Sequence, residues 1–287
     1  MRLKLAVEAR GYSATFKNAP DIEMRLMSSS EIAQALRAGA IHAGICGEDL
    51  LRESEPAMTR VRLVRALGFG PADLVVAAPK SWVDVRSMAD FDAVCHDFRA
   101  RNGRRLRVAT KYQSLARAFF DAHGIDDYRL VHSEGATEGA PATGAAEAIV
   151  DITTTGSTLA ANHLKILDDG VILKSQAQLA MSLAAAWDEQ GRAALAMLVD
   201  TIEARLRARA FRLVRAVLAK TESEIAALAK QLGARIIAAG PTVELECPTD
   251  SASGVAAFLV AAGAKDVSVV ASSYIFATLD QRPAHFA

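Results

Sequence analysis

The segment Ala148-Ile-Val-Asp151-Ile-Thr-Thr-Thr-Gly156-Ser-Thr-Leu159 gives the most information about the fold class of this chain. Ala148–Ile152 is almost wholly apolar and predicts a strand that is buried on both faces of a sheet. The strand delivers Asp151 to its carboxyl end, and the polar loop Thr153–Thr158 leads into a predicted helix that begins at Leu159. A buried strand, a short loop and a helix in this order predict the βα unit of an α/β fold.

The same alternation continues on the amino-terminal side of this stretch. Glycine ends three of the predicted helices, because Gly39, Gly103 and Gly124 each follow a helical pattern. The predicted strands are Leu3–Val7, Tyr12–Phe16, Ile22–Met27, Ile41–Gly47, Arg60–Leu67, Asp73–Ala78, Arg105–Ala109 and Arg129–His132, and the predicted helices are Glu31–Ala38, Asp90–Arg101, Ser114–His123 and Ala142–Glu147. This spacing favours βαβ units and a parallel sheet.

The carboxyl-terminal part has a different pattern. The apolar segment Ala177–Ala186 is expected to return the chain to the first lobe, and Glu189–Arg207 predicts a long helix. A βαββαβ unit of about 75 residues follows, the size of a small separate domain. We therefore expect a first lobe of residues 1–80 and 181–207, a second lobe of residues 81–180, and a small α+β domain of residues 208–287.

Composition excludes several classes of protein. Lys plus Arg and Asp plus Glu each number 33, so no overall charge favours nucleic acid or an acidic membrane surface. The three cysteines are widely spaced, which indicates a reducing compartment, and the scattered histidines do not predict a zinc site. No apolar run reaches the ~18 residues of a membrane span, and no signal peptide is recognisable. We expect a cytoplasmic protein.

The loop beyond Asp151 has the composition of a phosphate-binding loop. Threonine and serine hydroxyls add donors to the backbone N–H groups at a helix start, and Gly156 allows close approach of an anion. A carboxylate at the mouth of such a loop suits ribose hydroxyls or a bound Mg²⁺. The alternative is an ordinary threonine-capped helix after a buried strand.

The segment 138–159 resembles the signature of the ATP phosphoribosyltransferase family. The matching positions are Glu138, Gly144, Ala146, Ile149, Asp151, Thr155, Gly156, Thr158 and Leu159. Other family-like pieces occur in the right order, namely Asp21-Ile-Glu23, Ser29-Ser-Glu-Ile32, Gly44-Ile-Cys-Gly-Glu-Asp49, Leu67-Gly-Phe-Gly70 and Val108-Ala-Thr-Lys-Tyr112. The resemblance covers residues 1 to 207, and residues 208–287 resemble more loosely the regulatory domain of the long form.

This resemblance implies a fold, a reaction and a set of ligands. The fold would be a two-lobed, periplasmic-binding-protein-like catalytic core with a ferredoxin- or ACT-like carboxyl-terminal domain. The reaction would join ATP, through adenine N1, to phosphoribosyl pyrophosphate (PRPP), releasing pyrophosphate in the first step of histidine biosynthesis. Mg²⁺ would be the cofactor, histidine a feedback inhibitor, and the assembly a homo-oligomer, either a dimer or a hexamer.

The resemblance also assigns residues to ligands. The PRPP-binding residues would be Asp151, Thr153, Thr154, Thr155, Gly156, Ser157, Thr158 and Glu138, with Asp151 and Glu138 also contacting the metal. Gly47, Asp49, Lys111 and Tyr112 would face ATP. No residue is assigned as a general acid or base, because adenine N1 is already a nucleophile.

The sequence departs from the family directly after the first strand. The family has a Pro-(Ser/Asn)-Lys-Gly-like turn and an amphipathic helix, whereas here Leu3–Val7 runs through Arg10 into Tyr12–Phe16. This departure leaves open a catalytically impaired regulatory paralogue. A two-lobed solute-binding protein is a second alternative, because it would have the same topology of two lobes with a returning chain. A phosphoribosyltransferase acting on nucleobases is a further alternative, although its loop normally follows two adjacent acidic residues and Val150 precedes Asp151 here.

Overall fold

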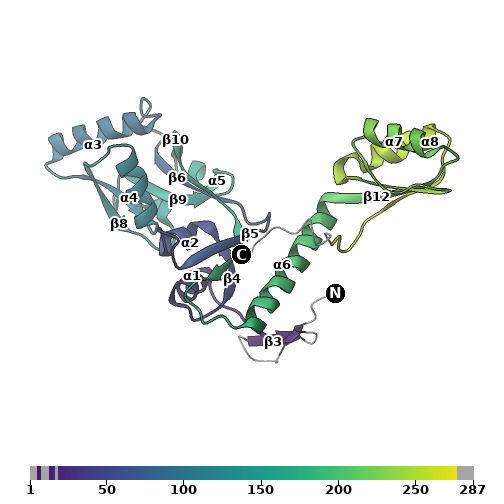
Figure 1. The fold of residues 1–287 in the computed structure, drawn as a ribbon. Helices are drawn as coiled ribbons and strands as arrows, with labels where there is room; N and C mark the ends of the chain where they lie inside the picture. The colour runs from purple at the N-terminus through teal and green to yellow at the C-terminus, as the bar shows by residue number, and fades with distance from the viewer. Residues whose placement is uncertain (1–4, 8–12, 17–18, 277–287) are drawn as a thin grey trace. The chain divides into compact units, whose positions relative to one another are not determined.

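The computed structural model describes residues 5–7, 13–16 and 19–276. The chain divides into two compact units, one of residues 5–188 and one that contains residues 189 onward (Figure 1). Residues 8–12, where the sequence departs from the family and where Arg10 lies, are outside the described residues. Among the described helices, none combines the length and the apolar composition that crossing a membrane requires.

The larger sheet of the first unit forms the second lobe. Its order is β10-β6-β9-β7-β8, built from β6 (Ala72–Pro79), β7 (Leu106–Thr110), β8 (Tyr128–His132), β9 (Ala148–Thr153) and β10 (Leu164–Ser175). The expectation of a parallel sheet is wrong for half of it. β7 pairs in parallel with β8 and β9, but β6 is antiparallel to both β9 and β10.

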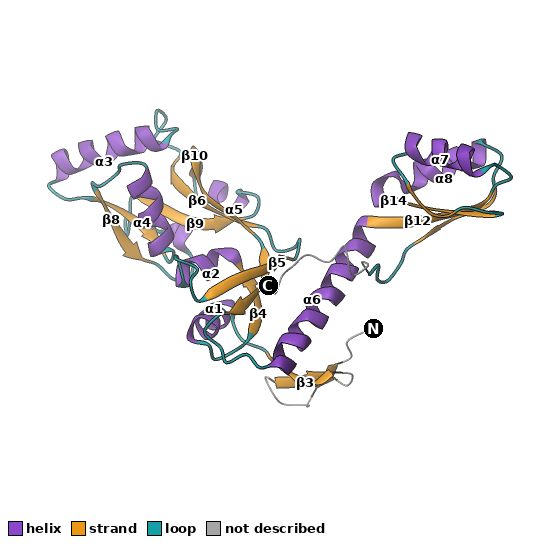
Figure 2. Cartoon of the chain, in the orientation of Figure 1, coloured by secondary structure: helices purple, strands orange, loops and turns teal. Residues whose placement is uncertain are grey.

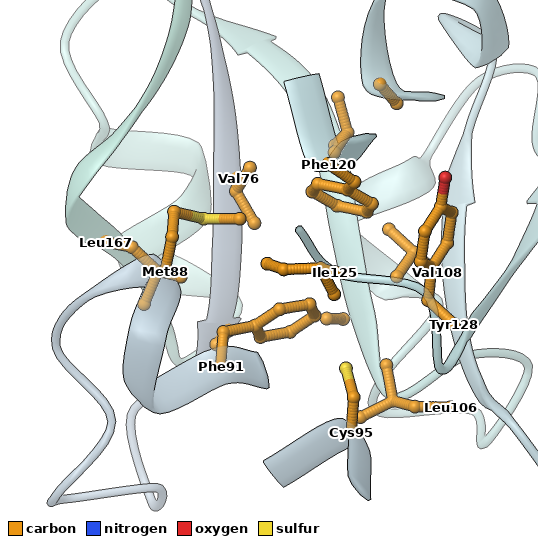
Figure 3. Packing of buried hydrophobic residues seen from close by; sticks show 14 of the residues in the cluster. Val76, Met88, Phe91, Cys95, Leu106, Val108, Phe120, Ile125, Tyr128 and Leu167 are labelled. Carbon is orange, nitrogen blue, oxygen red and sulfur yellow. The ribbon is translucent and has the colours of Figure 1, made fainter. Parts of the chain in front are cut away.

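Helices cover both faces of this sheet. α3 (Met88–Asn102) and α4 (Gln113–Ala122) pack on one face, where Phe91 and Phe120 meet Val76 and Val108 (Figure 3). On the other face, Leu159 of α5 (Ser157–Ala161) packs with Ile149. Burial on both faces explains the continuous apolar runs of β6 and β9.

A smaller antiparallel sheet forms the first lobe. Its order is β4-β11-β5, from β4 (Ala43–Gly47), β5 (Val61–Ala66) and β11 (Ala177–Ser182), and α1 (Ser29–Ala38) and α2 (Glu48–Ser54) accompany it. The chain crosses between the two sheets at Leu67–Pro71 and again at Gln176. These crossings lie side by side, because Leu67 N–H donates to Ala177 O and Gly68 N–H donates to the Gln176 side chain. A third sheet joins β1 (Leu5–Val7), β2 (Ser13–Phe16) and β3 (Ala19–Arg25).

The second unit is a ferredoxin-like domain preceded by a long helix (Figure 2). Its elements are α6 (Glu189–Ala210), β12 (Phe211–Val217), α7 (Glu222–Gln231), β13 (Arg235–Ala238), β14 (Thr242–Pro248), α8 (Ala252–Ala261) and β15 (Lys265–Val270). The antiparallel order β13-β14-β12-β15 places the first and third strands of the βαββαβ unit at the centre. Val214, Leu245 and Leu259 lie in its core. The α/β class, the two-lobed core and the small carboxyl-terminal sheet domain are confirmed.

The structure differs from the local predictions in three places. No strand was predicted between residues 163 and 177, where the structure has β10; its pairing with β6 shifts register between Ile166 and Val171, and one strand continues through this irregularity. Residues 142–147 are not helical, and the short helix of this loop is instead a 3₁₀ turn, η1 (Thr137–Gly139). The sequence pattern predicts the final strand over Val267–Phe276, whereas the structure has β15, which ends at Val270.

Candidate functional site

Strand β9 presents Asp151, which pairs with Val75 of β6, to a pocket near the carboxyl end of the strand. Ala148 and Val150 are fully buried, whereas Asp151 is half-buried. The pairing of β7 with β9 stops at Ala109 and Ile149, so that side of the strand is open beyond Val150. The carboxylate of Asp151 accepts a 2.8 Å hydrogen bond from the backbone N–H of Ile152, which fixes its position at the strand's end.

The loop after β9 is shaped by its own hydroxyl groups. Thr153 Oγ1 accepts a 2.8 Å hydrogen bond from Gly156 N–H, and Thr154 Oγ1 donates to Pro71 O. The hydroxyls of Thr155 and Ser157 are 2.9 Å apart. Gly156 has a φ of 74°, a left-handed conformation that glycine adopts without strain, and the chain turns there into α5.

A cavity of about 320 Å³ lies over this loop. Its lining residues are Ala72, Glu138, Asp151, Ile152, Thr153, Thr154, Thr155, Ser157, Thr158 and Leu159. The structure therefore brings together every predicted PRPP-binding residue except Gly156, which shapes the loop beneath. The cavity is of a size that holds a small ligand, and hydroxyls and two carboxylates surround it.

The surroundings of Asp151 disfavour the charged form of its carboxyl group. Burial raises the pKa of Asp151 above its ordinary value, although the N–H of Ile152 and the charge of Lys111 act in the opposite direction. Glu138 raises the pKa of Asp151 further, so the two carboxylates lie close enough to repel. Two adjacent oxygen-donor side chains that hold unfavourable charge fit a hard divalent cation, which takes carboxylate ligands together with phosphate oxygens.

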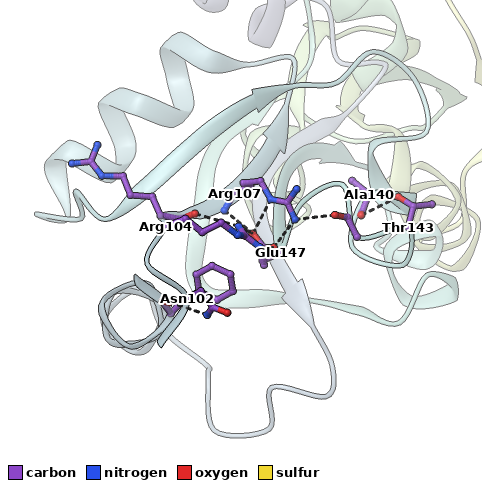
Figure 4. Close-up of polar contacts among 9 residues, drawn as sticks. Asn102, Arg104, Arg107, Ala140, Thr143 and Glu147 are labelled. Atoms are coloured by element: carbon purple, nitrogen blue, oxygen red, sulfur yellow. Dashed lines mark hydrogen bonds and ion pairs between the residues drawn. The ribbon is translucent and has the colours of Figure 1, made fainter. Parts of the chain in front are cut away.

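Glu138 reaches the pocket because its loop is anchored at both ends. At one end, the Ser133 hydroxyl lies 3.1 Å from the hydroxyl of buried Thr137. At the other end, Arg107 donates to Glu147 Oε1 over 2.7 Å and to Gly144 O over 2.8 Å (Figure 4). These contacts tie the loop to β7, next to the strand that carries Asp151.

The residues predicted to face ATP differ in their exposure to solvent. Lys111 is exposed, and its Nζ lies 5.0 Å from the centre of the Tyr112 ring. Asp49 and Tyr112 are buried, at 4% and 0% exposure, and the Tyr112 hydroxyl donates a 2.6 Å hydrogen bond to Asp49 Oδ2. The polar groups of these two side chains are thus directed at each other rather than at open solvent. Gly47 precedes them as the N-cap residue of α2.

Sequence reasoning missed some residues of this region. Ala72, Ile152 and Leu159 line the pocket, and the position of Ala72 at the start of β6 follows only from strand pairing that the local pattern does not contain. Glu53 was also missed, although its carboxylate accepts hydrogen bonds from the backbone N–H groups of Ser114 and Leu115.

Comparison with known proteins adds an independent observation. The family model described as "HisG: ATP phosphoribosyltransferase" matches residues 28–207. An ATP phosphoribosyltransferase of Caulobacter vibrioides (strain NA1000 / CB15N) is 60% identical over 208 residues, which are 72% of this chain and 65% of that protein. One from Nitrobacter hamburgensis is 49% identical over 273 residues, 93% of this chain and 84% of that protein. The chain thus spans just under two thirds of the Caulobacter protein's length.

A solved structure shares the fold. The ATP phosphoribosyl transferase (HisG:HisZ) complex from Thermotoga maritima contains a chain that matches with a TM-score of 0.52 and 21% identity, over 69% of this chain and 84% of that chain. The family model covers more than half of the sequence, including the loop beyond β9. This chain therefore belongs to the ATP phosphoribosyltransferase family.

Proposed function

We propose that this protein is an ATP phosphoribosyltransferase that joins ATP to PRPP and releases pyrophosphate. Adenine N1 attacks C1 of the ribose, the bond from C1 to the pyrophosphate oxygen breaks, and the charge that develops on C1 gives the transition state oxocarbenium character. The observation that carries the proposal is the cavity over the β9 loop, where Asp151, Glu138 and five hydroxyl-bearing residues surround a space for a sugar phosphate. Family membership supports the same reaction.

In this proposal different residues bind different parts of PRPP. The loop Thr153–Thr158 binds the 5-phosphate, because hydroxyls and backbone N–H groups are suited to an anion. Asp151 and Glu138 face the ribose hydroxyls and hold Mg²⁺. When bound, Mg²⁺ neutralises charge on the departing pyrophosphate. Catalysis then consists of holding two anionic substrates in line, and no side chain needs to remove a proton.

ATP occupies the side of the donor pocket that faces the first lobe. Lys111 is an exposed cation close enough to Asp151 to lower its pKa, and so it is suited to phosphate or pyrophosphate oxygens. Gly47 is the N-cap residue of α2, and in this proposal the amino-terminal end of α2 is the part of the first lobe that faces ATP. Asp49 and Tyr112 hold the amino-terminal end of α2 in place through the hydrogen bond between their side chains.

We further propose a regulatory role for the carboxyl-terminal domain and a location for the protein in the cell. The ferredoxin-like domain binds histidine as a feedback inhibitor and helps to assemble a homo-oligomer, a dimer or a hexamer. The protein works in the cytoplasm, where three unpaired thiols, Cys46, Cys95 and Cys247, remain reduced. The loose resemblance of residues 208–287 to the regulatory domain of the long form supports the proposal that this domain binds histidine.

The test is release of pyrophosphate from PRPP with Mg²⁺ and ATP. Asp151→Ala and Thr158→Ala are each expected to abolish turnover with the fold retained, and Thr242→Ala, at an exposed position of β14, is the matched control. Chelating Mg²⁺ is expected to stop the reaction, and histidine to inhibit it. Free nucleobases replace ATP in a parallel assay. Turnover with nucleobases alone, or full activity in both site variants, would contradict the proposal.

A further inference from the structure

We propose that α2 is a latch between the two lobes, which sets the angle at which the first lobe faces the donor pocket. The latch consists of Asp49 and Glu53 of α2, Tyr112 at the start of α4, and Ser175 at the end of β10. Its members make their polar contacts with one another and with backbone, so we assign them a positioning role rather than contact with substrate.

The first contact joins three segments through one carboxylate. Asp49 Oδ2 accepts a 2.6 Å hydrogen bond from the Tyr112 hydroxyl, and Asp49 Oδ1 accepts one of 2.8 Å from Ser175 Oγ. Ser175 Oγ also accepts from the backbone N–H of Asp49, over 3.1 Å. All three residues are at most 4% exposed. A buried carboxylate is stable only while its hydrogen-bond partners stay in place, so this contact opposes relative motion of the segments.

The second contact caps a helix of one lobe with a side chain of the other. The N-cap residue of α4 is Tyr112, whose side chain makes no capping hydrogen bond. Glu53 supplies the cap, because its Oε1 accepts from Ser114 N–H over 2.9 Å and its Oε2 from Leu115 N–H over 3.0 Å. A carboxylate at a helix amino terminus also interacts favourably with the helix dipole. Asp49 and Glu53 lie one helical turn apart, so α2 holds the start of α4 at two points.

The space beside Gly47 gives a second observation on the Asp49 carboxylate, because that carboxylate occupies the place where a side chain at position 47 would begin. A Cβ atom built on Gly47 would lie 2.3 Å from Asp49 Oδ1, although the φ of Gly47, −66°, suits any residue. Glycine is therefore required here by the space that the carboxylate occupies and not by the backbone.

The latch joins the first lobe to a pocket that it does not line. Every residue that lines the donor cavity belongs to the second lobe, between Ala72 and Leu159. The latch residue Tyr112 is adjacent to Lys111 and its ring contacts the Lys111 ammonium group. The positive charge of Lys111 acts on Asp151, which lines that cavity. A fixed lobe angle therefore leaves PRPP binding unchanged and determines whether an acceptor held by the first lobe is aligned for attack. The expected effect on turnover rests on the function proposed above. The fixed angle between the two lobes does not depend on that function.

Tyr112→Phe tests the latch, because it removes one hydroxyl and retains the buried ring. We expect kcat for pyrophosphate release to fall about tenfold, the scale of one hydrogen bond to a buried charge, while the Kd of PRPP measured by calorimetry with Mg²⁺ stays within about twofold. Tyr128→Phe is the matched control, since Tyr128 is a buried tyrosine of the same lobe whose hydroxyl makes no hydrogen bond within the described part of the chain. An unchanged kcat, or a Kd that weakens in parallel with kcat, would overturn the proposal.

A second measurement does not depend on turnover. Spin labels at Gln34→Cys in α1 and Ala100→Cys in α3 report the distance between the lobes, because both positions are exposed and the three native cysteines are buried. We expect Tyr112→Phe to broaden or shift the distance distribution and Tyr128→Phe to leave it unchanged. An unchanged distribution in Tyr112→Phe would overturn the latch, whereas absence of turnover in the parent with a changed distribution would overturn only the proposed function.

Discussion

The backbone N–H of Gly156 donates a hydrogen bond of 2.8 Å to Thr153 Oγ1, and this contact closes the loop beyond β9 into a turn. The turn requires a left-handed residue at position 156, where φ is 74°. It also places the Thr155 and Ser157 hydroxyls side by side at the edge of the cavity. The shape of the proposed phosphate site thus depends on a residue that does not line it.

Gly156→Ala is expected to weaken PRPP binding about tenfold while the protein remains folded. A Cβ there would contact only Ile166 Cδ1, at 3.8 Å, so the effect comes from strain of about 1–2 kcal/mol in a left-handed alanine. Calorimetric titration with PRPP and Mg²⁺ measures it. Gly103→Ala is the control, because Gly103 has a φ of 65° with open space around it and caps α3. Equal PRPP affinity in parent and Gly156→Ala would show that the turn does not shape the site.

Asp151→Asn is expected to stabilise the ligand-free protein at neutral pH while it abolishes activity. Burial raises the pKa of Asp151 above its ordinary 3.8, so the charged form costs free energy in the folded state. The variant should have a Tm higher by about 2 °C at pH 7. Its advantage should shrink as the pH falls through the raised pKa towards 3.8, because the carboxyl of the folded parent then becomes protonated and no longer holds a buried charge.

Thermal melts with and without Mg²⁺ and PRPP measure both parts of this prediction. The ligands should raise the Tm of the parent and not that of Asp151→Asn. Asp97→Asn, at an exposed position of α3, is the control for loss of a carboxylate. A variant that is less stable than the parent at pH 7 would show that Asp151 serves the fold rather than the ligand.

Glu147→Gln is expected to destabilise the protein by about 1–2 kcal/mol at pH 7. Burial acts to raise the pKa of Glu147, but hydrogen bonds from Arg107 and Arg104 outweigh it and lower the pKa from 4.5 to about 2. A lowered pKa stabilises the fold above 4.5, and this contribution is lost as the pH falls towards 2. Urea unfolding at pH 7 and pH 3 should therefore show a difference between parent and variant that shrinks at the lower pH. A constant difference would exclude the ion pair as its source.

Local patterns predicted the parts of the fold that local forces determine. The β9 strand and its loop were predicted because an apolar run followed by hydroxyl residues and glycine leaves few alternatives. The βαββαβ unit was predicted because two of its segments have a helical pattern, and each is followed by a glycine, Gly233 or Gly263, that ends the helix with a positive φ. Strand β10 was missed because Gly170 belongs to an irregular strand that only pairing with β6 maintains.

Long-range contacts account for what the sequence did not reveal. Tyr112 and Asp49 are 63 positions apart, and Glu53 reaches Ser114 across 61. No periodicity records such pairs, so the resemblance to the family placed Asp49 and Tyr112 near ATP without indicating that they bond to each other. The direction of β6 was missed for the same reason, because strand pairing is set by tertiary contacts rather than by the apolar pattern of one strand.

Gly47→Ala is expected to lower kcat to about the level of Tyr112→Phe, because the new methyl group displaces the Asp49 carboxylate from its partners. If both substitutions disrupt the same latch, the double variant should have a kcat no lower than that of the slower single variant. The measurement compares kcat of the two single variants and the double variant with kcat of the parent, and independent effects would instead multiply. Gly254→Ala is the control, since a Cβ there meets nothing within 4 Å and the residue lies in α8 of the other unit. Losses that multiply in the double variant would mean that Gly47 acts elsewhere, for example by direct approach of ATP to its backbone.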